Sequence, residues 1–221
     1  MFLIFSLLVL IFSVMVHEVS HGAVAYKLGD DTAKAMGRLN LNPLNHIDPI
    51  GSVLMPLFLV IINSPILFGW AKPVPYNPFN LKDPKLGAAL IGAAGPLSNF
   101  AIAIFFGILG KFLFLDASVK MVIAQSAPFG DTSVIHGPAE ALFFAFMFIV
   151  FINLLLGIFN LVPIAPLDGS KVLFALLPPR YHEVRQFLEQ YGIFLLLLFI
   201  FFGIGILEPL IRALYFLIAL A

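Results

Sequence analysis

Two histidines and a glutamate stand within five residues of one another in an apolar stretch, VMVHEVSHGAVAY at 14–26. On a helix, residues i and i+4 share a face about 6 Å apart, so His17 and His21 can both reach one metal ion at about 2.0–2.1 Å. Glu18 lies beside that face, where it can take a proton from water without binding the metal. This is the H-E-x-x-H pattern of zinc peptidases, and it predicts metal-assisted hydrolysis.

A catalytic zinc site needs three protein ligands and an open position. Asp168 is our first choice for the third ligand. It lies in FNLVPIAPLDGSKV at 159–172, where Pro163 and Pro166 must interrupt a helix and Gly169 allows a sharp turn. Spacing alone leaves two readings open for this carboxylate, a metal ligand or the cap of the helix that follows. The other residues considered for the third position are His46, Asp48, His136 and His182.

The composition is that of a membrane protein. Of 221 residues, 61% are hydrophobic and only 11% are charged, against roughly 25% charged in a soluble domain. The formal net charge of zero gives no reason to expect nucleic acid, and the absence of cysteine excludes disulfides and thiol metal sites. Ionisable side chains inside hydrocarbon are costly and are usually functional, which strengthens the interpretation of His17, Glu18 and His21.

Four of the five apolar runs are long enough to span a bilayer, which takes about 20 residues. The exception, Val53 to Phe68, is short and carries Pro56 and Pro65, so we expect a re-entrant or interfacial segment. No basic residue precedes Lys27, so the first run is expected to be a retained membrane helix and not a cleaved signal peptide. The long runs are Phe2 to Tyr26, Leu86 to Leu115, Ala139 to Leu161, and Tyr191 to about Tyr215, where Leu207-Glu208-Pro209 can break the helix.

The basic residues favour four full spans and one re-entrant element, with the N-terminus outside. With this topology nine of the twelve Lys and Arg residues lie on one side, whereas a fifth span would divide them six and six. The same topology brings Asp168 to the side on which the first helix ends. At 1.5 Å per residue, the histidine pair then lies about 9 to 15 Å inside that helix end.

The predicted fold is an all-α polytopic membrane protein, a single domain over 1–221. We expect about four to six transmembrane helices, a re-entrant segment and a short membrane-surface β-hairpin. The hairpin is predicted over Gly37 to Gly51, where leucines and asparagines alternate before turn residues. The stretch at 69–78 carries three prolines and is expected to be an extended loop.

Four motifs together resemble the site-2 protease family of intramembrane zinc metalloproteases, peptidase family M50. They are HEVSH at 17–21, FGWAKPVPYNP at 68–78, GPLSN at 95–99 and NLVPIAPLDG at 160–169. The resemblance implies one zinc ion per chain bound by His17, His21 and Asp168, with Glu18 as general base. It also implies a multi-pass protein of the cell (inner) membrane whose active site lies near the cytoplasmic side. The chain looks like a minimal member without a PDZ domain.

The family cleaves membrane-spanning segments of other proteins, so the expected partners are such a substrate and the lipid bilayer, with no nucleic acid. Oxyanion stabilisation needs a hydrogen-bond donor, and Asn160 is the first candidate because the resemblance places it near the metal. Asn153 and Asn99 are further candidates, and interhelical hydrogen bonding is the alternative for all three. A non-proteolytic zinc-binding relative and a membrane transporter are the alternative functions.

Overall fold

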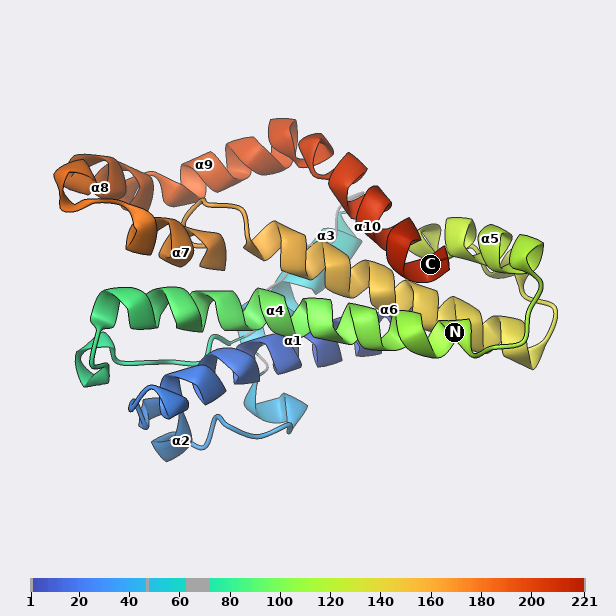
Figure 1. Ribbon diagram of the computed structural model, residues 1–221, viewed down its shortest axis with the longest axis horizontal. Coiled ribbons are helices and arrows are strands. Elements are labelled where there is room, and N and C mark those ends of the chain that lie inside the picture. Colours follow the sequence, from blue (N-terminus) through green and yellow to red (C-terminus); the bar gives the residue numbers. More distant parts are fainter. Residues whose placement is uncertain (1, 47, 63–71, 221) are drawn as a thin grey trace.

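The computed structural model describes residues 2–46, 48–62 and 72–220. Its frame is a bundle of three long helices, α1 (Phe2–Lys27), α4 (Pro84–Lys111) and α6 (Pro138–Asn160) (Figure 1). Each is long and apolar enough to cross a membrane. Apolar side chains such as Leu3 and Phe105 point outward, as expected for a surface that contacts lipid.

Local chemistry fixes the ends of the long helices. The Asp83 carboxylate accepts from the backbone N–H groups of Lys85 and Leu86 at 3.0 and 2.9 Å, which caps α4 ahead of Pro84. Proline at the first position of a helix costs no hydrogen bond, and α6 also begins with one. At its other end α6 stops at Asn160, three residues before the first of the two predicted helix-breaking prolines.

The helix α4 lies at the centre of the bundle and packs against α1, α6 and the short α7 (Asp168–Leu176). The end of α1 and the start of α4 lie at the same end of the bundle. Asp30, just after α1, accepts hydrogen bonds from Asn77 N and Asn80 Nδ2, both at 2.7 Å. The intervening chain therefore returns to the end from which it left, which agrees with a segment that does not cross.

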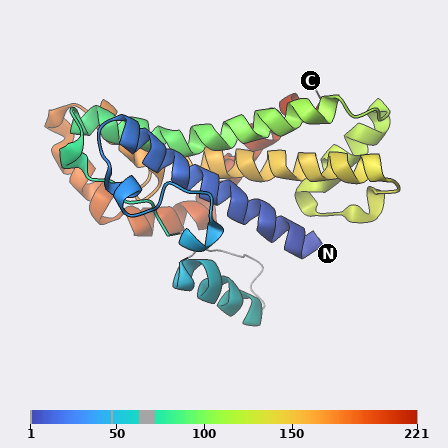
Figure 2. The ribbon, with the colours of Figure 1, turned by 90° about the horizontal axis from the view of Figure 1, so that it is seen from below.

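Only part of the predicted re-entrant segment is described. The π-helical turn η2 (Pro49–Leu54) leads into α3 (Met55–Ile61), which stands away from the bundle (Figure 2). Residues 63–68 lie outside the described part of the chain. Re-entry of this segment into the membrane therefore stays a prediction.

The predicted surface β-hairpin is not confirmed, since the described residues between 37 and 51 form turns and loop without a strand. Asparagine side chains accept hydrogen bonds from nearby backbone N–H groups, in place of the backbone hydrogen bonds between two strands. The Asn40 Oδ1 atom accepts from Asn42 N at 2.8 Å, and Asn42 Oδ1 accepts from Leu44 N at 3.1 Å. The second bond caps the 3-10 turn η1 (Pro43–Asn45).

The C-terminal apolar run forms a broken element and not one straight span. Among the described helices, α8 (His182–Gln190) meets α9 (Gly192–Leu198) and its π-helical extension η7 (Phe199–Gly203) at a bend of 67°. A second interruption follows this bend. The 3-10 turn η8 (Ile204–Ile206) ends just before Leu207, and α10 (Glu208–Leu220) begins at the next residue, so this interruption ends at the predicted Leu207-Glu208-Pro209. The described residues thus supply three spans, or four if the bent pair is one, and the exact count is not confirmed.

The main apolar core lies at the bundle end opposite α7. There α6 packs against α4, α10 and α5 (Ala117–Ser126) around Phe143, Met147 and Tyr215. The buried Tyr215 hydroxyl donates to the Ala124 carbonyl at 2.8 Å, so its polar end is satisfied. The remaining short elements are α2 (Thr32–Ala35), η3 (Pro78–Asn80), η4 (Ala127–Phe129), η5 (Thr132–Val134) and η6 (Pro179–Tyr181).

Candidate metal centre

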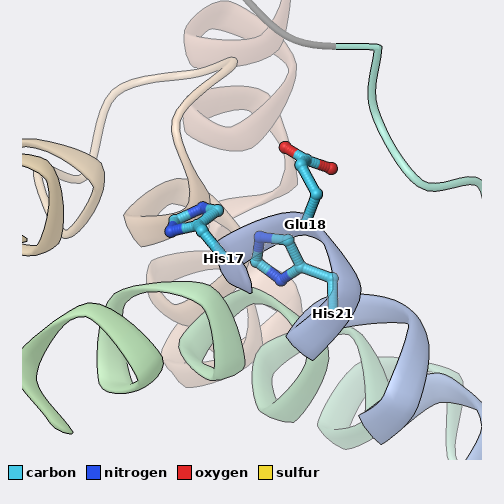
Figure 3. Close-up of side chains that lie close together, drawn as sticks. All are labelled: His17, Glu18 and His21. Atoms are coloured by element: carbon cyan, nitrogen blue, oxygen red, sulfur yellow. The ribbon is translucent and has the colours of Figure 1, made fainter. Parts of the chain in front are cut away.

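His17, Glu18 and His21 project from one stretch of α1, as the helical spacing predicts (Figure 3). The histidines are buried, at 5% and 6% exposure, and their ring centroids are 4.7 Å apart. Potential ligand atoms of all three residues lie within 4.8 Å of one another. Such a cluster inside an apolar helix is the arrangement expected for a buried metal site.

Asp168 reaches the histidine pair from the far side of the double-proline break. Its Oδ2 atom lies 2.9 Å from His17 Nε2 and 3.0 Å from His21 Nε2, and the residue is 6% exposed. Leu167 occupies the N-cap position of α7, and Asp168 is its first residue. Of the two readings that the sequence left open, this placement supports the metal ligand.

The donor atoms fit a zinc ion in type and spacing. Two imidazole nitrogens and one carboxylate oxygen form a frequent catalytic zinc set, and tetrahedral bonds of about 2.0–2.1 Å separate ligand atoms by about 3.3 Å. The other ring nitrogens have acceptors: His17 Nδ1 lies 2.6 Å from Asn99 Oδ1, and His21 Nδ1 lies 2.6 Å from the Ile91 carbonyl. Protons on both Nδ1 atoms would leave the Nε2 lone pairs facing the Asp168 carboxylate, an arrangement that a cation between them stabilises.

Gly95 on α4 forms the wall beneath the two imidazoles. A Cβ atom at this position would lie 2.5 Å from His17 Nε2 and 2.5 Å from His21 Nε2. The sequence alone assigns Gly95 no chemical role beyond its place in GPLSN at 95–99. The structure shows instead that the donor atoms themselves require a glycine at this position.

Lys171 contacts the oxygen of Asp168 that faces away from the histidines. Its Nζ atom lies 2.8 Å from Asp168 Oδ1, within the same turn of α7. This ion pair occupies one carboxylate oxygen and leaves the other directed at His17 and His21. Sequence reasoning missed Lys171, although its position three residues after the carboxylate on a helix is a usable signal.

Glu18 is held by the proline-rich segment at 72–77. Its Oε2 atom accepts a hydrogen bond from Val74 N at 2.9 Å. Val74 is buried, and it contacts α1 next to Gly22, where an added Cβ would approach the Val74 side chain to 2.7 Å. The segment therefore orients the carboxylate beside the histidine pair.

The same segment has a second anchor at Asp30, which is fully buried. Burial by itself raises the pKa of this carboxyl group, but hydrogen bonds from Thr32, Asn77 and Asn80 outweigh that effect and hold its pKa below the usual range. The ionised carboxylate thus joins the end of α1 to the chain that carries Val74.

The other histidines and Asp48 have contacts of their own. His46 is buried, with Nε2 2.9 Å from the Asn40 carbonyl, and Asp48 accepts from Ile50 N at the start of η2. His136 precedes α6 at the opposite end of the bundle, and His182 begins α8.

Of the three candidate asparagines, Asn99 and Asn153 connect to the histidine pair. Asn99 contacts His17 and donates to Asn153 Oδ1 at 2.9 Å. Asn160 is the last residue of α6 and donates to the Leu156 carbonyl of its own helix at 2.9 Å. Its predicted role as an oxyanion donor stays a prediction.

Comparison with known proteins bears on this centre. Residues 5–199 match the family model described as Peptidase family M50. The chain belongs to peptidase family M50. The resemblance inferred from the four motifs is therefore confirmed.

Individual relatives agree with the family. The chain is 36% identical over 211 residues to YwhC of Bacillus subtilis (strain 168), covering 95% of this chain and 86% of that protein. It is 24% identical to Rip2 of Mycolicibacterium smegmatis, covering 81% of this chain and 60% of that protein. It is 28% identical to MJ0392 of Methanocaldococcus jannaschii, covering 90% of this chain and 42% of that protein. All three names contain the words zinc metalloprotease. No solved structure matches the chain.

Proposed function

We propose that this peptidase is a zinc-dependent intramembrane protease that hydrolyses peptide bonds in or near the transmembrane segments of other proteins. Its family and the zinc metalloprotease names of its relatives support the enzyme class and the metal. One observation carries the proposal for this chain: Asp168 Oδ2 meets both histidine Nε2 atoms in a buried site within an apolar bundle.

We propose that His17, His21 and Asp168 hold one zinc ion. When bound, zinc polarises a carbonyl group and makes water a nucleophile at neutral pH. The protein supplies a fixed donor set in a buried site, with Lys171 on the second Asp168 oxygen. Interactions between charges in this buried site are stronger than they would be in water.

Glu18 would act as the general base. Its carboxylate lies next to the histidine pair and accepts a hydrogen bond from Val74 N, which holds it in place. It would take a proton from the attacking water and later deliver that proton to the leaving amine. Asn160 is kept as the candidate oxyanion donor, because an amide NH₂ has two N–H bonds and the contact with Leu156 uses one.

We propose an inner-membrane location with the active site near the cytoplasmic side. At the histidine end of the bundle, Lys27 ends α1, Lys85 is the second residue of α4 and Lys171 lies in α7, whereas at the other end Lys111 ends α4 and Lys120 lies in α5. An excess of Lys and Arg is typical of cytoplasmic loops. The depth of the site supports the proposed substrate class, because His17 and His21 lie within α1, a helix long and apolar enough to cross a membrane.

The decisive experiment compares the wild type with Glu18→Gln in proteoliposomes that also contain a single-span test substrate. We expect the variant to retain one zinc per chain and to lose cleavage by at least about 100-fold, the low end for a general base. Equal cleavage by both proteins would contradict the proposal. Zinc without any peptide product from the wild type would favour a non-proteolytic relative, and zinc or proton flux without product would favour a transporter.

A further inference from the structure

Two buried asparagines link His17 to the backbone of α6. His17 Nδ1 lies 2.6 Å from Asn99 Oδ1, and Asn99 Nδ2 donates to Asn153 Oδ1 at 2.9 Å. Asn153 Nδ2 in turn donates to the Ile149 carbonyl and to Ser13 Oγ, both at 2.9 Å. Both asparagines are fully buried, and Ser13 is 4% exposed. The chain of contacts crosses α1, α4 and α6, which lie together in the bundle (Figure 1).

The direction of this hydrogen-bond chain is fixed at its far end. A backbone carbonyl can only accept, so the nitrogen of the Asn153 amide must face Ile149. Its oxygen then faces Asn99 and requires the Asn99 nitrogen, which turns the Asn99 oxygen toward His17. An oxygen acceptor at that position requires a proton on His17 Nδ1.

A proton on Nδ1 leaves the lone pair on His17 Nε2, the atom that faces Asp168. His21 reaches the same tautomer in one step, because its Nδ1 lies 2.6 Å from the Ile91 carbonyl of α4. The tautomer of each histidine is thus set by a backbone carbonyl group. For His21 the carbonyl is in direct contact, and for His17 it acts through two side-chain amides.

We propose that Asn99 and Asn153 are positioning residues that set the metal-binding tautomer of His17, with the orientation transmitted from the α6 backbone. The proposal rests on the proposed function, since the tautomer matters for a metal ligand. It assigns Asn153 a directional role that simple helix packing would not need. Without an acceptor at position 153, the Asn99 amide nitrogen keeps only a longer contact of 3.5 Å with the Ser13 carbonyl, so the amide can turn more easily and present its NH₂ group to the ring.

The first test uses Asp168→Ala, because the Asp168 carboxylate lies 2.9 Å from His17 Nε2 and in the metal-free protein would itself accept a hydrogen bond from a proton on that atom. The full chain with this change, labelled with ¹⁵N in its histidine rings and stripped of metal by a chelator, is measured in detergent at about pH 8.5, well above the usual imidazole pKa. The His17 signal is assigned by its loss in His17→Gln. We expect the Nδ1–H tautomer for His17 in the metal-free protein. An Nε2–H tautomer would overturn the proposal.

The second test compares Asn153→Leu with Asn153→Asp, and uses Ser6→Ala as a control on the outer part of α1. A buried, protonated carboxyl group keeps one acceptor and one donor, so Asn153→Asp should preserve the His17 tautomer and the zinc affinity. Asn153→Leu should shift the tautomer and raise the zinc Kd about fivefold, the factor for one ordinary net hydrogen bond. Asn99→Leu, which removes the direct partner, should raise it about 10- to 100-fold.

Zinc alone is the probe, in competition with a chelator. Equal zinc affinity and an unchanged tautomer in folded Asn153→Leu would overturn the proposed role of Asn153. Failure of the proposed function has a different outcome: the wild type would bind no zinc and cleave nothing, while metal-free His17 would still show the Nδ1–H tautomer.

Discussion

Replacing Gly95 with alanine tests whether the space between the imidazoles is a metal site. The added Cβ would lie 2.5 Å from the Nε2 atoms of His17 and His21, whereas ordinary contact begins at 3.4 Å. The nitrogens would have to retreat by about 0.9 Å, far beyond the ±0.2 Å that a metal–ligand distance tolerates. We therefore expect the zinc Kd to rise by more than about 100-fold, since loss of a mere orienting partner already costs about 10- to 100-fold.

The assay is a zinc titration of purified Gly95→Ala in detergent, together with cleavage of a single-span substrate. Overpacking should cost about 1–3 kcal/mol of stability, so the helical content must be checked. Gly110→Ala on the same helix is the matched control, because its Cβ would crowd the end of Met147 at 3.0 Å and the Phe143 ring at 3.1 Å, far from the histidines. Wild-type zinc affinity and cleavage in Gly95→Ala would refute the reasoning.

Three further predictions follow. Lys171→Met should weaken zinc binding about 10-fold in a chelator competition, while Lys171→Arg should stay near wild type, because a cation must hold the second Asp168 oxygen; equal affinities for the two variants would contradict this. Asp30→Asn should lower the free energy of unfolding by about 1–3 kcal/mol. It should also speed proteolytic nicking of residues 72–77. Chelation should stop cleavage and leave the far-UV helical signal intact, and added zinc should restore turnover.

The pH dependence of stability gives another test of the Asp30 anchor. Its pKa is lower in the folded protein than the usual value of 3.8, so its contribution is fully present above about pH 4 and is lost as the pH falls through the lowered pKa. Melting temperatures of the wild type should therefore fall toward those of Asp30→Asn under acid conditions. A constant difference between the two proteins at all pH values would contradict this assignment.

The sequence predicted the parts of the site that depend on local spacing. The i, i+4 separation of His17 and His21 places both on one helix face, and the two prolines before Asp168 end α6 where the chain must turn. Charge asymmetry then put Asp168 at the correct end of the bundle. Each of these inferences uses only neighbouring residues or the number of membrane crossings.

Contacts between helices were beyond such reasoning. Asn153 and Asn160 are seven residues apart and share a helix face, yet Asn153 meets Asn99 while Asn160 bonds within its own helix. Their depth along α6 decides this, and the sequence does not give that depth. The surface hairpin was not confirmed because four alternating residues, 39–42, fit local asparagine turns as well as a strand.

Zinc X-ray absorption of the wild type and Asp168→Asn tests the central claim most directly. For the wild type we predict one zinc with a shell of nitrogen and oxygen ligands at about 2.0–2.1 Å, including two imidazoles. In Asp168→Asn we predict a changed shell and a lower zinc content. An unchanged shell in the variant, or wild-type zinc without imidazole ligands, would contradict the proposed metal centre.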